Sequence, residues 1–281
     1  MVRLYNTLSR SVESLETKVT GKVGLYVCGM TVYDYCHIGH ARAMMAFDVV
    51  VRHLRRRGYD VNFVRNHTDV DDKIIARAKE RGINPLELSA QFIRELDADL
   101  DSVGLIAPNI APQVSAHIPD VVAMISRLVA KEHAYLAENG DVYFSIESSP
   151  GYGKLSGRKL EDLRAGERVA VEEAKRHPGD FALWKSAPNT DELGWDAPFG
   201  RGRPGWHIEC SAMAERHLGE TFDIHGGGID LVFPHHENEI AQSECATGHQ
   251  PFARYWMHNG HLTMVDDAGD QVIEAAGEGC D

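Results

Sequence analysis

The sequence lacks any apolar run long enough to cross a membrane. A transmembrane helix needs about 20 consecutive apolar residues, but the hydrophobic residues, 43% of the chain, are dispersed among charged ones that make up 25%. The N-terminus, MVRLYNTLSR, also lacks the apolar core of a secretory signal peptide. We therefore expect no membrane association, and the composition is typical of a globular protein.

Cysteine is scarce, and its pattern argues against disulfides. The chain has five cysteines, at positions 28, 36, 210, 245 and 280. Small secreted domains that depend on disulfides carry denser, even-numbered sets. We therefore expect reduced thiols or metal ligands, and a cytoplasmic location.

Positive charge is in short supply. The chain carries 29 lysines and arginines against 42 acidic residues, which gives a formal net charge of −13. This balance argues against indiscriminate binding of nucleic acid. Basic residues do cluster between positions 52 and 57 and between 158 and 176. These clusters indicate either solvated helix faces or a local basic patch.

Two common motifs are missing. No GxxxxGK[ST] sequence occurs, which excludes a P-loop. The run His235-His236-Glu237-Asn238-Glu239 is not the H-E-x-x-H arrangement of zinc proteases. A metallohydrolase is a remote hypothesis, because no separate general base is evident.

The most informative stretch that is present runs from Tyr26 to His40, YVCGMTVYDYCHIGH. A predicted strand ends at Cys28-Gly29, and His37-Ile38-Gly39-His40 is predicted to open a helix. Strand-to-helix turns of α/β sheets bind ligands. The first turn of a helix also presents unpaired N–H groups that suit phosphate. This junction is therefore the centre of the predicted site.

The residues that follow predict a βαβ unit. Apolar residues recur at helical spacing up to Leu54, Gly58 is placed to end the helix, and 61–65 is a predicted strand. The two strands should be parallel. A polar string, residues 66–72, then lies at the sheet edge that faces ligands. Its residues either have a functional role at that edge or cap the helix predicted over 73–81.

Further elements are predicted from periodicity and turn residues. A helix should start at Asn84-Pro85, and a hairpin is indicated around 138–144. A strand at 221–224 should run into Gly226-Gly227-Gly228. The remaining predicted elements are an edge strand at Leu4-Tyr5, helices over 119–131, 206–218 and 234–247, and a final strand at 255–257.

Four separated motifs resemble the class I aminoacyl-tRNA synthetases, and specifically the cysteinyl-tRNA synthetase family. His37-Ile38-Gly39-His40 is similar to the HIGH tetrapeptide of that class. The cysteine-specific members are matched by Cys28, by Gly205 to Cys210 and by Phe233 to Glu239. The resemblance covers roughly residues 1 to 272.

The resemblance implies an α/β fold, with a Rossmann-like parallel-sheet nucleotide-binding domain split by a small connective insertion. We expect the first half of the catalytic domain over residues 1–133 and the insertion over 134–200. The second half, with a zinc-site helix, is expected over 201–272. An acidic tail that matches nothing in the family covers 273–281. We expect a monomer.

The resemblance also implies one zinc ion, held by Cys28, Cys210, His235 and Glu239. His235 and Glu239 are four residues apart, so a helix projects both from one face. Two sulfurs, one nitrogen and one oxygen suit tetrahedral zinc. Each residue alone has a simpler explanation, because buried cysteines and helix histidines are usually packing residues.

The resemblance implies ATP binding, with Mg²⁺, at two places. His37 and His40 are expected to be catalytic, because they can donate hydrogen bonds to phosphate oxygens as charge develops. Gly39 would let the nucleotide approach the backbone. The triplet Gly226, Gly227 and Gly228 with Asp230 would form the adenosine shelf, although a glycine triplet alone is also typical of a turn.

The implied substrates are ATP, L-cysteine and the acceptor end of tRNA(Cys). Gly29, Thr68 and Trp206 are expected near the cysteine, although Trp206 could equally be a core residue. Zinc would explain how cysteine is told from serine, because an apolar pocket rejects a near-isostere by only about 10²-fold. A thiolate–metal bond supplies a contact that an alkoxide at neutral pH does not.

The resemblance fails after residue 272. The family carries a lysine-rich KMSKS loop there, but no lysine follows Lys185 in this sequence. The helical anticodon-binding region of the family has no match either. We expect a cysteine–tRNA ligase weakened by truncation. Two alternatives are a ligase that joins activated cysteine to a small amine, as in the mycothiol pathway, and a non-catalytic module that binds cysteine or zinc.

Overall fold

The computed structural model describes residues 1–159 and 174–265 and the backbone of 271–275. Within these ranges the chain forms two compact units. Unit 1 comprises the described residues of 1–113, 222–232 and 253–281, and unit 2 comprises those of 114–221 and 233–252. These limits differ from the domain boundaries expected from the sequence, which stay a prediction. Residues 276–281 of the expected acidic tail lie outside the described part.

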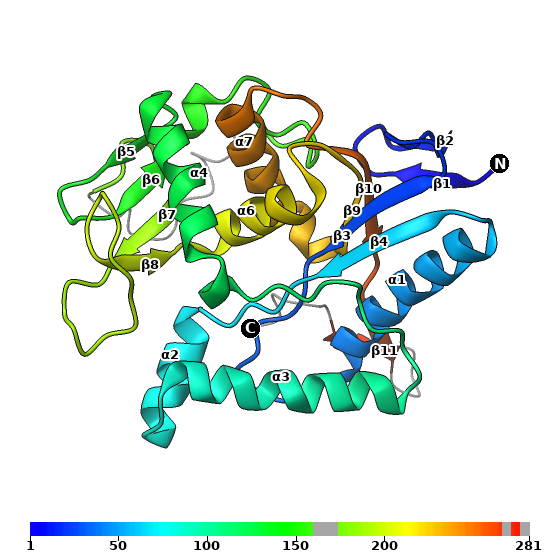
Figure 1. The fold of residues 1–281 in the computed structure, drawn as a ribbon, viewed down its shortest axis with the longest axis horizontal. Helices are drawn as coiled ribbons and strands as arrows, with labels where there is room; N and C mark the ends of the chain where they lie inside the picture. The colour runs from blue at the N-terminus through cyan, green and yellow to red at the C-terminus, as the bar shows by residue number, and fades with distance from the viewer. Residues whose placement is uncertain (160–173, 266–270, 276–281) are drawn as a thin grey trace. The chain divides into compact units, whose positions relative to one another are not determined.

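Unit 1 is built on a four-stranded sheet in the order β10-β9-β3-β4 (Figure 1). Its strands are β3 (Lys22–Val27), β4 (Asp60–Arg65), β9 (Phe222–Gly228) and β10 (Ala253–Asn259), and every pair is parallel. Val27 is in register with Arg65 on one side and with Gly226 on the other. The carboxyl ends of three strands therefore meet at one edge.

Helix α1 (Ile38–Arg56) connects β3 to β4, as the predicted βαβ unit requires. Its apolar face packs against the sheet in a core that includes Phe47, Val51 and Leu54. A second core lies between α1, α2 (Asp72–Arg81) and α3 (Pro85–Ser102). Asp71 caps α2 and Asn84 caps α3, so the predicted helix starts are confirmed to within one residue.

Two hairpins complete unit 1. Strands β1 (Arg3–Asn6) and β2 (Ser11–Ser14) are antiparallel, so an edge strand does form at Leu4-Tyr5. Strands β11 (Leu262–Val265) and β12 (Gln271–Ala275) are also antiparallel. The strand predicted at 255–257 is confirmed as part of β10, but it is not the final strand, because β11 and β12 follow it. A short helix, Ile229–Val232, follows β9.

Over its described residues, unit 2 combines an antiparallel sheet with three α-helices. The sheet order is β5-β6-β7-β8, with strands Ala134–Leu136, Val142–Phe144, Phe181–Ser186 and Gly202–Pro204. The helices are α4 (Ile118–Ala130), α6 (Trp206–Leu218) and α7 (His235–Thr247). Two short helical turns lie at Val114–Ala116 and Ile146–Ser148. Residues of the helices and the sheet share one core, which includes Leu128, Trp184 and Ile208.

Two local predictions need correction. The glycine triplet was expected just after a strand, but Gly226 to Gly228 are the last three residues of β9 itself. The strand continues through the glycines because β10 pairs with all three of them and β3 pairs with Gly226. Pro234 was expected as the first residue of a helix, but it is the N-cap residue of α7.

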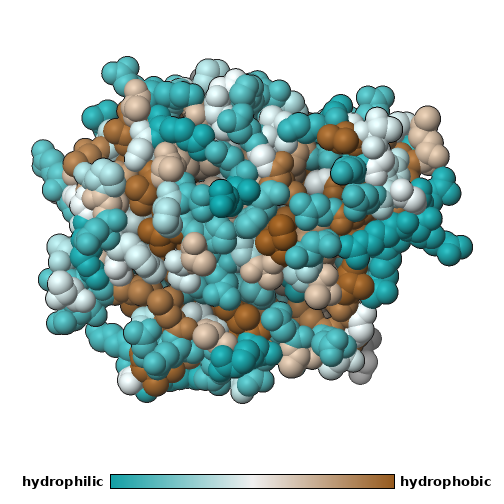
Figure 2. Space-filling model, viewed as in Figure 1, coloured by the Kyte–Doolittle hydropathy of each residue, from teal (hydrophilic) through white to brown (hydrophobic). Residues whose placement is uncertain are grey.

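The surface carries mixed polarity. On the face drawn in Figure 2, hydrophobic residues occur in small groups among hydrophilic ones. Among the described residues, no helix has the length and apolar character that a bilayer crossing requires.

Candidate active site

A pocket in unit 1 lies at the carboxyl edge of the parallel sheet. Its lining brings together residues that the sequence predicted for three different roles. It contains the predicted metal ligand Cys28, the predicted substrate residue Gly29 and the nucleotide residue His40. Gly227, Gly228 and apolar residues of α1 complete the wall. The parallel register of β3 and β9 explains this convergence.

The two histidines of the HIGH tetrapeptide cap α1 reciprocally. Nδ1 of His37, the N-cap residue, accepts a hydrogen bond from the backbone N–H of Gly39 at 3.1 Å. Nδ1 of His40 accepts one from the backbone N–H of His37 at 3.3 Å. Because each Nδ1 is an acceptor, each neutral ring must carry its proton on Nε2. The helix start therefore fixes both imidazoles as Nε2–H donors.

The same geometry keeps these rings neutral. Burial, followed by the nearby His37, lowers the pKa of His40 to about 4. Burial also lowers the pKa of His37. The ring centroids are 3.7 Å apart, so a charge on one ring would repel a charge on the other. At neutral pH the pair offers two hydrogen-bond donors at a helix N-terminus.

The end of β9 presents close-packed glycines and a buried carboxylate. A Cβ at Gly226 would lie 2.2 Å from the Phe47 ring, and one at Gly228 would lie 2.2 Å from a carboxylate oxygen of Asp230. Neither oxygen of Asp230 has a hydrogen-bond partner among the described residues. Burial raises the pKa of this carboxyl, and Nε2 of His261 lies 3.9 Å from it. The carboxylate can thus accept hydrogen bonds from a ligand.

Gly29 and Thr68 are brought together at the ends of β3 and β4. The side chain of Asn66 joins them. Its Oδ1 accepts from the Gly29 N–H at 3.0 Å, and its Nδ2 donates to Oγ1 of Thr68 at 3.2 Å. Asp71, rather than Thr68, caps α2. The capping explanation for the polar string therefore holds for Asp71, and Thr68 belongs to the sheet edge.

Unit 2 gathers three of the four predicted metal ligands. Cys210 on α6 and His235 and Glu239 on α7 each offer a ligand atom, and these atoms lie within 4.8 Å of one another. Nε2 of His235 is 3.1 Å from Oε1 of Glu239. All three residues are at most 2% exposed. A buried thiol, imidazole and carboxylate at this spacing fit a zinc ion. Cys28, the fourth predicted ligand, lies in unit 1.

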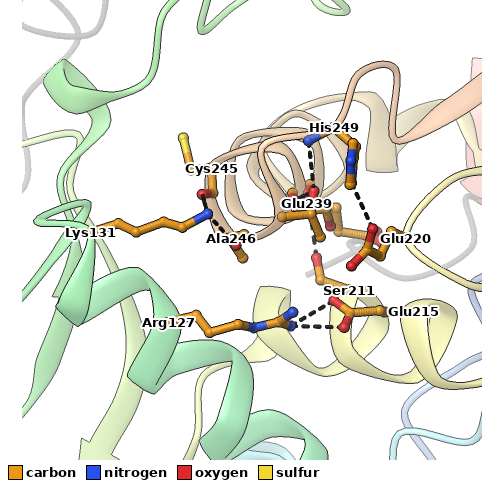
Figure 3. A network of polar contacts seen from close by, with 11 residues as sticks. Arg127, Lys131, Ser211, Glu215, Glu220, Glu239, Cys245, Ala246 and His249 are labelled. Atoms are coloured by element: carbon orange, nitrogen blue, oxygen red, sulfur yellow. Dashed lines mark hydrogen bonds and ion pairs between the residues drawn. The ribbon is translucent and has the colours of Figure 1, made fainter.

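Aromatic and polar contacts surround this trio. The Trp206 ring stacks on His235 with centroids 4.3 Å apart, and Nδ1 of His207 lies 3.0 Å from Nδ1 of His235. The hydroxyl of Ser211 on α6 donates to the backbone oxygen of Glu239 at 3.4 Å. Figure 3 shows this contact beside two peripheral ion pairs, Arg127–Glu215 and His249–Glu220.

Three residues escaped the sequence reasoning. Asn66 was treated as part of a polar string, and His207 and Glu237 only as members of the motifs Gly205 to Cys210 and Phe233 to Glu239. Glu237 is 1% exposed and its carboxylate accepts backbone N–H bonds from the segment 153–156. For Asn66, the available signal was a short polar side chain just past a predicted strand. The contacts of His207 and Glu237 join segments that are distant in the sequence, so no local pattern predicts them.

Curated relatives share most of this chain. A protein described as cysteine–tRNA ligase from Marinobacter nauticus is 61% identical over 263 residues, covering 94% of this chain and 56% of that protein. The cysteine–tRNA ligase of Alkalilimnicola ehrlichii is 58% identical, and the match covers 95% of this chain and 57% of that protein. The chloroplastic and mitochondrial cysteine–tRNA ligase of Arabidopsis thaliana is 56% identical, and the match covers 93% of this chain and 46% of that protein. The chain spans about half the length of the relatives it matches.

Solved structures share the fold. Mycobacterium tuberculosis methionyl-tRNA synthetase in complex with methionyl-adenylate aligns with a TM-score of 0.64 at 13% identity, covering 85% of this chain and 57% of that one. A putative arginyl-tRNA synthetase from Campylobacter jejuni aligns with a TM-score of 0.55 at 11% identity, covering 90% and 58%. These neighbours confirm the predicted Rossmann-like α/β class.

The family model described as the class I (C) tRNA synthetase catalytic domain matches residues 14–270. That range contains the HIGH histidines, the glycine-ended β9 and the trio of Cys210, His235 and Glu239. The chain therefore belongs to the family of class I (C) tRNA synthetase catalytic domains.

Proposed function

We propose that this chain activates L-cysteine with ATP to form cysteinyl adenylate, and that the cysteinyl group passes to the acceptor end of tRNA(Cys). The cysteine carboxylate would attack the α-phosphorus in line, and magnesium pyrophosphate would leave. No covalent bond to the protein is required. Positioning and electrostatics would supply the rate, as for phosphoryl transfer in general. Membership of the family and the identity to cysteine–tRNA ligases support this proposal.

The nucleotide would bind along the sheet edge in unit 1. The Nε2–H groups of His37 and His40 would donate to phosphate oxygens, where negative charge grows in the transition state. Gly39 is buried in the first turn of α1, where backbone N–H groups favour anions. Gly226, Gly227 and Gly228 would face the adenosine, and Asp230 would accept from the ribose hydroxyls.

One zinc ion would be held by Cys210, His235 and Glu239 together with Cys28. When bound, zinc supplies a direct contact to the substrate sulfur. Trp206, stacked on His235, would keep that ligand in place and line the cysteine pocket. Gly29 and Thr68 would contact the rest of the amino acid. We also propose Mg²⁺ as the counter-ion of ATP, a monomeric protein and a cytoplasmic location.

The observation that carries the proposal is the convergence of a thiol, an imidazole and a carboxylate in the core of unit 2. We expect about one zinc per chain by elemental analysis of the purified protein. Cys210→Ser should lose most of that zinc, because a serine hydroxyl is a poor ligand for zinc. Calorimetry should then show that L-cysteine binding weakens by at least tenfold.

Cys245→Ser provides the matched control. Cys245 is also a buried cysteine, 9% exposed, on the neighbouring helix α7. Its sulfur belongs to no ligand group among the described residues, so the zinc content should not change. Equal zinc loss in both variants, or a wild-type protein without zinc, would contradict the proposed metal site.

Cysteine-dependent ATP–pyrophosphate exchange tests the proposed activation of cysteine. Assays with small amines in place of tRNA would show whether the cysteinyl group passes to a different acceptor.

A further inference from the structure

Asn66 occupies a position that links the two predicted cysteine-binding residues of unit 1. It follows the last residue of β4 and is 1% exposed. Its side chain contacts Gly29, at the end of the neighbouring β3, and Thr68, two residues further along its own loop. The two segments are also joined through the backbone, since Val32 N–H donates to Thr68 O at 3.1 Å.

The orientation of the Asn66 amide follows from its partners. A backbone N–H can only donate, so the atom that faces Gly29 must be the oxygen. The NH₂ group must then face Thr68, and Oγ1 of Thr68 is the acceptor of that bond. The Thr68 hydroxyl consequently keeps its own hydrogen, with one lone pair, for another partner.

The backbone of Asn66 fixes Gly29 as well. A Cβ on Gly29 would lie 1.7 Å from the carbonyl oxygen of Asn66. Gly29 therefore packs directly on Asn66 and also lines the pocket. One residue thus sets both the position of the Gly29 backbone and the direction of the Thr68 hydroxyl.

We propose that Asn66 is a positioning residue for the amino-acid substrate, which acts by orienting the Thr68 hydroxyl and the Gly29 backbone toward the cysteine. This inference rests on the proposed function, because it takes L-cysteine as the occupant of the pocket. Asn66 itself does not touch the substrate.

The test is a double-mutant cycle of Asn66→Asp with Thr68→Val, read by calorimetric binding of L-cysteine and, separately, of ATP. The aspartate side chain has the same shape as that of Asn66 and still accepts from Gly29, but its carboxylate makes Thr68 the donor. We expect the Kd for L-cysteine to rise about tenfold, since one buried hydrogen bond is redirected. The Kd for ATP should change by less than about twofold.

In the Thr68→Val background the same Asn66→Asp change should raise the cysteine Kd by less than about threefold, because the hydroxyl that Asn66 orients is gone. The cycle also removes the effect of the added charge, which both backgrounds share. Asn62→Asp, within β4, is the matched control for a new carboxylate on the same strand. If Asn66→Asp does not fold, Asn66→Ser takes its place in the same cycle.

Equal losses of cysteine affinity with and without the Thr68→Val substitution would overturn the inference, and so would an Asn66→Asp protein that binds cysteine like wild type. A parallel loss of ATP and cysteine binding would indicate a general structural role and would overturn it too. A wild-type protein that binds no L-cysteine would refute the proposed function itself, and this outcome is visible before any variant is made.

Discussion

At the scale of single residues, the arrangement of the HIGH histidines shows how one motif serves two purposes. Serine, threonine and aspartate are the usual capping residues of helices. In α1 the imidazoles of His37 and His40 cap the helix instead, and each accepts a hydrogen bond through Nδ1. The cap therefore leaves the Nε2–H groups available as donors. The stabilisation of the helix start and the presentation of the donors depend on the same two rings.

Gly29 is the residue where side-chain size should matter most. We expect Gly29→Ala to lower the free energy of unfolding by about 1–3 kcal/mol, because the new Cβ would overlap a backbone oxygen that cannot move easily. Cysteine binding should weaken in parallel, since Gly29 lines the pocket. Urea denaturation and calorimetry measure the two effects.

Gly260→Ala is the control for that substitution. A Cβ at Gly260 would meet no heavy atom of the described residues within 4 Å, so stability should change by less than about 0.5 kcal/mol. A Gly29→Ala protein as stable as Gly260→Ala would show that the close contact with Asn66 is not tight in solution.

At the scale of elements, helix α7 does more than present the two proposed metal ligands. Glu237 lies between His235 and Glu239, and accepts backbone N–H bonds from Gly153 at 3.0 Å, Leu155 at 3.1 Å and Ser156 at 2.7 Å. Lys154 forms an ion pair with Glu244 on the same helix. The segment 153–156 is therefore fastened to α7 by buried carboxylates.

We expect Glu237→Gln to destabilise the protein by about 2–3 kcal/mol. The amide keeps one acceptor oxygen, so at least one buried N–H loses its partner, and the remaining bonds lose the help of the charge. Chemical denaturation measures the change. Limited proteolysis should also cut the segment 153–156 faster than in wild type, because its anchor on α7 is weaker.

Glu220→Gln is the matched control, because Glu220 is an exposed partner of His249 in the same unit. Exposed ion pairs contribute less than about 1 kcal/mol, so its unfolding should resemble that of wild type. Similar stabilities for the two variants would mean that the three backbone bonds to Glu237 contribute little.

At the scale of the whole molecule, acid should destabilise unit 1 through two partly buried histidines. Burial, followed by a neighbouring histidine in each case, lowers the pKa of His40 to about 4 and that of His258 to about 3. In the unfolded chain both rings titrate near 6.5. Below that pH the unfolded state binds more protons, so the free energy of unfolding falls as pH decreases from about 6.5 toward 4.

We expect the double variant His40→Gln, His258→Gln to show a shallower decline over this window, by roughly 1–3 kcal/mol between pH 7 and pH 4.5. Urea denaturation at several pH values measures the decline. Carboxylates and any bound metal respond to acid equally in both proteins, so the comparison isolates the two rings. Parallel curves would indicate that these histidines protonate in the folded protein as readily as in the unfolded one.

Much of the fold could be predicted because its signals are local. The proline and asparagine that begin α3, and the glycines that follow α6 and α7, mark helix ends whatever the rest of the chain does. The spacing of His235 and Glu239 likewise required only a helix to bring the two side chains within 3.1 Å. The family resemblance rests on the same local motifs, and the matched range 14–270 confirms it.

The sequence by itself determined the described α-helices, the strands of the parallel sheet and the chemical identity of the residues at the sheet edge. Only the tertiary structure decided that β9 lies between β3 and β10, that Asn66 bridges Gly29 and Thr68, and that Glu237 holds a segment more than 80 positions away in the chain. The physical reason is that periodicity and capping record contacts over a few residues. Partnerships between distant segments arise from packing, which leaves no repeat in the sequence.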